Sequence, residues 1–151
     1  MASSSAADSG WHVGDPGGDQ LTSRVIRAFF DVYRELGHGF LEAVYLRAMV
    51  VALRNAGLEV AMEVPLPVSY RGVVVGEYRA DLVVSDSLIV ELKAADRLAP
   101  THRAQVINYL KATPIERALL MNFGPRPSFE RIILTRDRKR TRADQPTSPS
   151  V

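Results

Sequence analysis

The 151-residue sequence contains no cysteine. This absence excludes disulfides and thiolate-bound zinc, so any metal would need oxygen or imidazole ligands. Histidine is also scarce, with three residues, His12, His38 and His102. An oxygen-ligated hard cation such as Mg²⁺, or Mn²⁺ in its place, is therefore the expected type of metal.

Long apolar runs are missing as well. No stretch of the sequence approaches the roughly 18 residues that a membrane-spanning helix needs. The N-terminus lacks the basic and apolar regions of a signal peptide, and residues 1–20 contain three acidic residues and no lysine or arginine. That composition also argues against an arginine-rich transit peptide. We expect a cytoplasmic protein without a membrane partner.

The two ends of the chain differ in composition from its middle. Residues 1–19 are rich in Ser, Ala, Gly and Asp without periodicity, which predicts a disordered tail. Residues 135–151 hold five basic and two acidic residues. Such a basic tail can help to hold a polyanion, although a solvated, disordered end explains the composition equally well. Residues 20–134 are expected to form one domain.

Hydrophobic periodicity predicts an α+β domain. Apolar residues recur at three- and four-residue steps from Leu21 to Leu36 and from Leu41 to Ala56, and a third helix is expected over Pro100–Thr113. Strands are expected at Val60–Tyr70, Val73–Val84, Leu88–Lys93, Arg117–Phe123 and Phe129–Leu134. The order ααβββαββ predicts a mixed central sheet flanked by helices. The prolines at 65 and 67 indicate that the first strand is an edge strand or ends before Pro65.

Charged residues occur in the otherwise apolar second and third strands. If the hairpin loop is Ser85–Ser87, antiparallel partners have numbers that sum to 172, so Asp81 faces Glu91. Directly opposed side chains have Cβ atoms about 4.5–5.5 Å apart. Lys93 lies two residues beyond Glu91 and hence on the same face. The sequence therefore predicts two carboxylates and one ammonium group that converge between apolar strands.

This convergence has two interpretations. Like charges that face each other are destabilising, and burial adds to the cost of ionising them. A Mg²⁺ ion bound by Asp81 and Glu91 would offset that cost, and Lys93 could then orient a water or stabilise charge on a phosphoryl group. A buried ion-pair cluster without a catalytic role is the alternative. Glu42, beside the apolar stripe of the second helix, is a further metal ligand, a partner for a core cation or a surface residue.

Several segments resemble one known family. Gly39–Tyr45 reads Gly-Phe-Leu-Glu-Ala-Val-Tyr and fits the G-x-x-E-x-x-Y signature of the small GxxExxY proteins, which are assigned to the PD-(D/E)XK nuclease superfamily. The similarity continues through Val64–Val68, Gly76–Leu82, Val90–Ala94, Ala104–Thr113, Asn122–Gly124 and Arg131–Leu134. The resemblance covers about residues 20–134 in the right order. It implies the restriction-endonuclease-like αβββαβ core.

The resemblance also implies roles for individual residues. Asp81 and Glu91 are similar to the family's metal ligands, with the carbonyl of Leu92 as a third and Glu42 completing the metal shell. Lys93 is similar to the residue that positions the attacking water. Gln105 and Tyr109 match the Q-x-x-x-Y pattern of the RecB-like branch and would lean over the same site, with helix packing as the other interpretation for both residues. His102 lies near a substrate phosphate or in solvent.

Three functions are compatible with these residues. The first is a Mg²⁺-dependent nuclease that hydrolyses phosphodiester bonds of DNA or RNA. The second is a non-catalytic nucleic-acid-binding or interaction module that retains the nuclease fold, and the third is a small-molecule-binding domain. The third has little support, because the sequence holds no glycine-rich phosphate loop in the strand-turn-helix context that such a loop requires. Paired cuts would need a homodimer, for which no interface pattern is visible.

Overall fold

The computed structural model describes residues 16–143, and side chains within residues 20–139. The elements are α1 (Pro16–Leu36), α2 (Glu42–Asn55), β1 (Val60–Tyr70), β2 (Val73–Val84), β3 (Leu88–Lys93), α3 (Pro100–Lys111), β4 (Arg117–Phe123), β5 (Pro127–Ile133) and α4 (Arg136–Ala143). The expected order ααβββαββ is confirmed, and a fourth helix follows it.

The first helix begins earlier than the sequence indicates. It starts at Pro16, so residues 16–19, which composition assigns to a disordered tail, are helical. A proline suits the first position of a helix, because its fixed φ is helical and its missing N–H would have no partner there. Residues 1–15 of the expected tail lie outside the described residues.

The helix α4 lies in the segment for which composition predicts a disordered tail, and residues 136–143 are helical. Polar contacts attach this helix to the chain just beyond α3. The Lys139 ammonium donates to the carbonyl oxygens of Thr113, at 2.7 Å, and of Ile115, and the Arg136 N–H donates to Glu116 Oε2. Because these contacts involve no apolar side chain, hydrophobic periodicity could not indicate them. Residues 144–151 lie outside the described residues.

The five strands form one sheet in the order β1-β2-β3-β4-β5. Neighbouring strands are antiparallel except β3 and β4, which are parallel and joined through α3. The sheet is mixed, as expected. β1 continues through Pro65 and Pro67 as an edge strand, so the interpretation that it ends before Pro65 is wrong. Pro is tolerated in an edge strand, where one side needs no ladder hydrogen bond.

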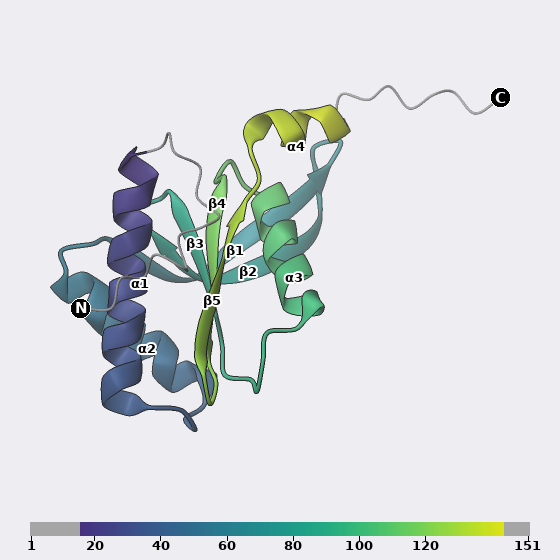
Figure 1. The fold of residues 1–151 in the computed structure, drawn as a ribbon. Helices are drawn as coiled ribbons and strands as arrows, with labels where there is room; N and C mark the ends of the chain where they lie inside the picture. The colour runs from purple at the N-terminus through teal and green to yellow at the C-terminus, as the bar shows by residue number, and fades with distance from the viewer. Residues whose placement is uncertain (1–15, 144–151) are drawn as a thin grey trace.

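Helices cover both faces of this sheet (Figure 1). On one face, α1 and α2 pack Phe29, Tyr45 and Leu53 against the even-numbered residues of β2 and β3. On the other face, α3 packs Val106, Tyr109 and Leu110 against a second cluster that includes Ile89 and Leu120. Leu82–Val84 and Leu88–Val90 are buried throughout, as expected for strands covered on both sides.

The connection from β3 to α3 is fixed by the end of β4. The buried amide of Asn122 accepts the N–H of Ala95 and donates to the carbonyl of Ala95, both at 2.9 Å. Gly124 leaves room for this contact, because a Cβ at that position would lie 2.1 Å from the Ala95 oxygen. A further hydrogen bond joins α1 to this segment, since the Tyr33 hydroxyl donates to the carbonyl oxygen of Gly124 at 2.7 Å.

We expect Gly124→Ala to destabilise the protein, because the new methyl group must displace the backbone at Ala95. The free energy of unfolding should fall by about 1–3 kcal/mol, the usual cost of overpacking. Urea denaturation followed by circular dichroism measures this change. Gly76→Ala is the matched control, since no atom lies within 4 Å of its Cβ position. Equal stabilities of the two variants would show that the close approach at Gly124 is unimportant.

Candidate active site

Asp81 and Glu91 meet where β2 and β3 part. The register Val84↔Leu88, Val83↔Ile89 and Leu82↔Val90 confirms the predicted sum of 172, and the paired residues end there. At the next position, Asp81 and Glu91, side-chain hydrogen bonds replace the backbone pairing. The Leu92 N–H donates to Asp81 Oδ2 at 2.8 Å, and the Asp81 N–H donates to Glu91 Oε1 at 3.1 Å. Each carboxylate is thus bound to the backbone of the opposite strand.

The pairing of β2 with β1 is also interrupted at Asp81. Met62 pairs with Leu82 and Val64 with Ala80, and between them Glu63 has a φ of +50°. A non-glycine residue in this left-handed region costs free energy, and such residues cluster at functional sites and strand irregularities. Asp81 therefore lies at a point where the sheet is loosened on both sides.

Glu91 is the buried member of the pair, with 3% of its surface exposed. Its Oε2 accepts a hydrogen bond from the Tyr109 hydroxyl at 3.1 Å. The Lys93 ammonium lies 3.7 Å from the same oxygen. Two strands and α3 thus bring one ammonium, one phenol and two carboxylates together on the α3 face of the sheet, as the sequence predicts for Asp81, Glu91 and Lys93.

Burial and the negative charge of Asp81 raise the pKa of Glu91 from 4.5 to about 7. The Asp81 N–H, Lys93 and Tyr109 act in the opposite direction, because each favours the ionised carboxylate. The pKa of Tyr109 is raised by burial and by Glu91, so its hydroxyl stays protonated and remains a donor. The site therefore holds more negative charge than its own donors fully stabilise.

Gln105 and Tyr109, four residues apart on α3, hold the charged groups of the strands. Gln105 Oε1 accepts a hydrogen bond from the Lys93 ammonium at 2.9 Å, and Tyr109 binds Glu91. Residues at this spacing share a helix face. The prediction that they lean over the site is consistent with this arrangement, and in the described structure they contact Lys93 and Glu91.

His102 has a structural contact of its own. The ring Nδ1 of His102 accepts a hydrogen bond from the backbone N–H of Ala99 at 3.0 Å. The backbone N–H of His102 donates to the Ala99 carbonyl. These two bonds close the first turn of α3, in the manner of a capping box. One ring nitrogen of His102 is thus engaged in holding the start of the helix that carries Gln105 and Tyr109.

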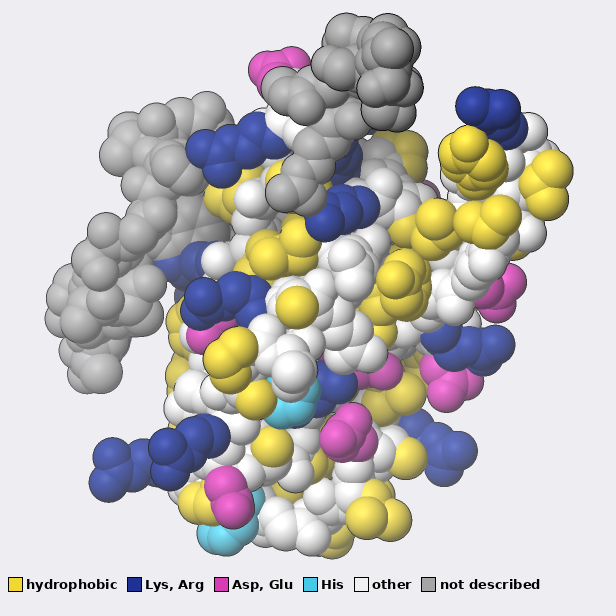
Figure 2. All heavy atoms as spheres, turned by 90° about the vertical axis from the view of Figure 1, so that its right-hand side faces the viewer, with side chains coloured by type: hydrophobic (Ala, Val, Ile, Leu, Met, Phe, Trp, Pro, Cys, Tyr) yellow, Lys and Arg dark blue, Asp and Glu magenta, His cyan; other side chains and the backbone are white. Residues whose placement is uncertain are grey.

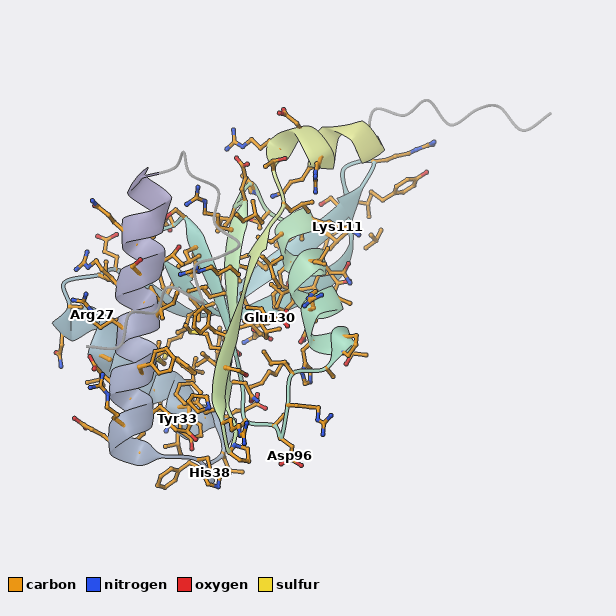
Figure 3. The ribbon with its side chains drawn as sticks, viewed as in Figure 1. Arg27, Tyr33, His38, Asp96, Lys111 and Glu130 are labelled. Atoms are coloured by element: carbon orange, nitrogen blue, oxygen red, sulfur yellow. The ribbon has the colours of Figure 1, made fainter. Side chains whose placement is uncertain are left out.

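Glu42 lies across the sheet from this cluster. It is the first residue of α2, is exposed, and precedes Tyr45, which packs in the core on the α1 and α2 face. Figure 3 shows His38, in the loop before α2, at the same end of the molecule as Asp96, in the loop after β3. Within the described residues, no three His, Asp or Glu side chains form a group that could hold a metal, so Glu42 does not join Asp81 and Glu91.

Tyr45 is a residue whose function the sequence did not predict. Its hydroxyl donates to the carbonyl of Gly37 at 2.7 Å and accepts the N–H of Phe40 at 3.2 Å. Its ring stacks on Phe123 with centroids 4.2 Å apart. Tyr45 therefore closes the loop between α1 and α2. The G-x-x-E-x-x-Y spacing was the available signal, because it places this tyrosine one turn after Glu42.

Comparison with known protein families identifies a superfamily for this chain. A family model described as the PD-(D/E)XK nuclease superfamily matches residues 19–132. The chain belongs to the PD-(D/E)XK nuclease superfamily. Its helices and five-stranded mixed sheet are consistent with the restriction-endonuclease-like fold, so the expected fold is confirmed.

Comparisons with solved structures and with curated protein sequences do not narrow the assignment further. The crystal structure of SSO0001 is similar to this chain with 22% identity and a TM-score of 0.46, over 68% of this chain and 55% of that one. The chain thus spans about half the length of SSO0001. No curated protein sequence matches. In the described part of the chain, no helix is long and apolar enough to cross a membrane.

PD-(D/E)XK nucleases generally use divalent metal ions, and the donors present fit a hard cation. Asp81 and Glu91 offer carboxylate oxygens, and a cation between them would oppose the burial and the charge of Asp81 that raise the pKa of Glu91. Two carboxylates suffice for Mg²⁺, which retains several waters and often takes the remaining oxygens from a substrate phosphate. The residues that would hold the ion are Asp81 and Glu91.

We expect Glu91→Gln to stabilise the metal-free protein in alkaline solution. The folded state keeps the Glu91 proton up to about pH 7, because burial and Asp81 raise the pKa of this group from the ordinary glutamate value of 4.5. The stability that this proton contributes is therefore complete below pH 4.5 and is lost as the pH rises through 7. Relative to wild type, the variant should gain about 3 kcal/mol of unfolding free energy over that range.

Urea denaturation in EDTA at about pH 5 and about pH 8 measures this difference. Glu35→Gln is the control, since Glu35 is an exposed glutamate on α1. If wild type and Glu91→Gln show parallel changes of stability with pH, Glu91 is ionised normally in the folded protein.

Proposed function

We propose that this protein is a Mg²⁺-dependent nuclease that hydrolyses phosphodiester bonds of DNA or RNA. The observation that carries the proposal is the convergence of Asp81, Glu91 and Lys93 on one face of the sheet, with Lys93 held 3.7 Å from Glu91 and 2.9 Å from Gln105. An ammonium beside a carboxylate pair is the arrangement that phosphoryl transfer needs, because charge develops on the phosphoryl oxygens.

Each side chain has a definite task in this proposal. A bound divalent ion would polarise the phosphoryl group and lower the pKa of a water. Lys93, whose side chain is 16% exposed, can direct its ammonium at a water or a phosphoryl oxygen while Gln105 fixes its position. Tyr109 holds Glu91 in one orientation through its hydroxyl. A group that is already oriented loses no further freedom when substrate binds.

The narrower GxxExxY assignment is part of the proposal. Its support is the Gly39–Tyr45 segment. The Tyr45 hydroxyl closes the loop between α1 and α2, and Glu42 is the first residue of α2 after that loop. Glu42 would contribute to the metal shell only if the start of α2 moves toward Asp81, and the Leu92 carbonyl would be a further ligand. His102 keeps Nε2 for a substrate phosphate, because its contact with Ala99 uses Nδ1.

A non-catalytic nucleic-acid-binding module is the second candidate. It is favoured by the hydrogen bonds that Asp81 and Glu91 already receive from Leu92, Asp81 and Tyr109. Such bonds satisfy the buried Glu91 and the partly buried Asp81 without any metal, so the cluster could serve stability alone. The two candidates differ in whether nucleic acid is cut.

Cleavage of DNA and RNA with Mg²⁺ or Mn²⁺ tests the proposal. Asp81→Asn keeps an acceptor for the Leu92 N–H but removes the charge, and Lys93→Met keeps the length of the side chain. We expect each variant to lose at least about a hundredfold in rate, the usual effect of removing one charge-stabilising group. Substrates should include single-stranded and duplex forms of both nucleic acids.

The control for cleavage is Lys111→Met, which removes an exposed lysine of α3 at the opposite end of the molecule from Asp96 (Figure 3). Its rate should equal that of wild type. If wild type cuts nothing yet binds nucleic acid with a steep dependence on salt, the enzyme is excluded and the binding module is supported.

Metal binding has an independent test. Mg²⁺ or Mn²⁺ at saturating concentration should raise the melting temperature of wild type, because a ligand of the folded state stabilises it by mass action. Asp81→Asn should abolish the shift. An equal shift in both proteins would mean that the ion binds elsewhere, and no shift in wild type would argue against a metal site at Asp81 and Glu91.

A further inference from the structure

The hairpin of β1 and β2 projects beyond the rest of the sheet. These strands have 11 and 12 residues, whereas β3 has six and pairs only with the last residues of β2. In Figure 1 the hairpin passes α3 and its turn lies at the end of the molecule near α4. In its distal part, α3 covers one face over part of the length. No strand pairs with the free edge of β2 there.

One face of this hairpin is apolar along its whole length. Leu66 and Ala80 are buried under α3, and by alternation along β1 Val68 and Tyr70 continue the same face. The register with β2 shifts between Val68 and Ser69, where Val75 is the extra residue of β2. Val73 pairs with Tyr70 and shares that face. Exposure rises toward the turn, to 60% for Tyr70 and 63% for Val73. Figure 2 shows hydrophobic side chains gathered on the projection at its upper right.

This apolar face begins at the candidate active site. The ring of Tyr78, which is 37% exposed, lies 5.7 Å from that of Tyr109, whose hydroxyl binds Glu91. Tyr78 pairs with Leu66 and so belongs to the same face. A ligand chain placed with one end at Lys93 could therefore follow the hairpin from Tyr78 to Tyr70 without leaving this surface.

Basic residues outnumber acidic ones around this face. Arg71 lies over the ring of Tyr70 at 5.2 Å, and α4, at the same end of the molecule, carries the exposed Arg136 and Arg138 beside Asp137, with Arg136 3.8 Å from Glu116. The acidic residue of the distal hairpin, Glu77, pairs with Pro67 and lies by alternation on the opposite face. Aromatic rings with neighbouring guanidinium groups, as at Tyr70 and Arg71, are typical of surfaces that hold bases and phosphates together.

The edge of β1 is a poor place for a protein partner to add a strand. Pro65 and Pro67 remove two N–H donors from this strand. A two-fold contact through the turn would in addition bring the Arg71 guanidinium groups of two copies near each other, and like charges repel. We therefore expect a ligand to bind the side-chain face of the hairpin and not its edge. A polyanionic ligand with exposed apolar groups fits these features better than a second copy of this chain.

We infer that the Tyr70–Arg71–Val73–Tyr78 face of the β1–β2 hairpin binds the bases of single-stranded nucleic acid. In a duplex the bases are stacked on one another, so only a single strand or a single-stranded end can place a base on Tyr70 or Tyr78. The inference rests on the proposed function for the choice of nucleic acid as ligand. It names single strands as the class of substrate that reaches Lys93.

Binding without cleavage tests this inference. Full-length protein in EDTA is titrated with fluorescently labelled oligodeoxythymidine or oligouridine and with a duplex of the same length, and anisotropy gives the Kd. We expect the single strands to bind more tightly than the duplex. Tyr70→Ala should weaken single-strand binding about tenfold or more, the effect of losing one stacked base, and Tyr70→Trp should restore it.

Val51→Ala is the matched control, because Val51 is a comparably exposed apolar residue, at 59%, on α2. Its affinity should equal that of wild type. The inference is overturned if wild type does not bind single strands, if duplex binds as tightly, or if Tyr70→Ala binds like Val51→Ala. It is also overturned if light scattering shows a dimer that Tyr70→Ala dissociates while affinity stays unchanged, because the face then belongs to a second copy.

The outcome is separable from that of the proposed function. A protein that binds single strands through Tyr70 but cuts nothing with Mg²⁺ or Mn²⁺ supports the hairpin surface and refutes the nuclease. A protein that cuts, with a KM unaffected by Tyr70→Ala, supports the nuclease and refutes the hairpin surface.

Discussion

The structure depends on keeping two neighbouring carboxylates inside a sheet. Asp81 and Glu91 lie on adjacent strands beside the buried apolar residues Leu82 and Leu92, and burial together with the charge of Asp81 makes ionisation of Glu91 unfavourable. The sheet meets part of this cost by giving up regular pairing. Backbone N–H groups of Asp81 and Leu92 bind the carboxylates, and Glu63 takes a left-handed conformation on the neighbouring strand. The remaining charge is what a cation would stabilise.

The same constraint determines the position of α3. Tyr109 and Gln105 reach Glu91 and Lys93 only if this helix lies at a fixed distance from β3, and the connection between them is short. Asn122 binds both polar groups of the Ala95 backbone, and Gly124 permits the approach. His102 closes the first turn of the helix. Residues that bear no charge thus determine where the charged groups meet.

Local pattern predicted the strands and the hairpin register closely, because alternation and loop length are properties of contiguous sequence. From that register followed the convergence of Asp81, Glu91 and Lys93. The contacts of Asn122, Gly124 and His102 were not predictable in this way. They join segments through backbone groups, and the amino-acid sequence gives no periodic signal for contacts of that kind. The helix α4 was not predicted for the same reason, because the contacts of its Lys139 are with backbone carbonyl groups.

Glu42 shows how a motif can combine structural and chemical residues. A fixed spacing between Gly39, Glu42 and Tyr45 suggests a single site, yet Tyr45 uses its hydroxyl to close the loop at Gly37 and Phe40 and its ring to stack on Phe123. Phe123 lies between Asn122 and Gly124, which hold the chain beyond Lys93. The loop that begins α2 and the loop that follows β3 are therefore tied to the same end of β4. A displacement of the start of α2 would therefore disturb the contacts of Tyr45 with Gly37 and Phe123, next to the residues that hold the chain beyond Lys93.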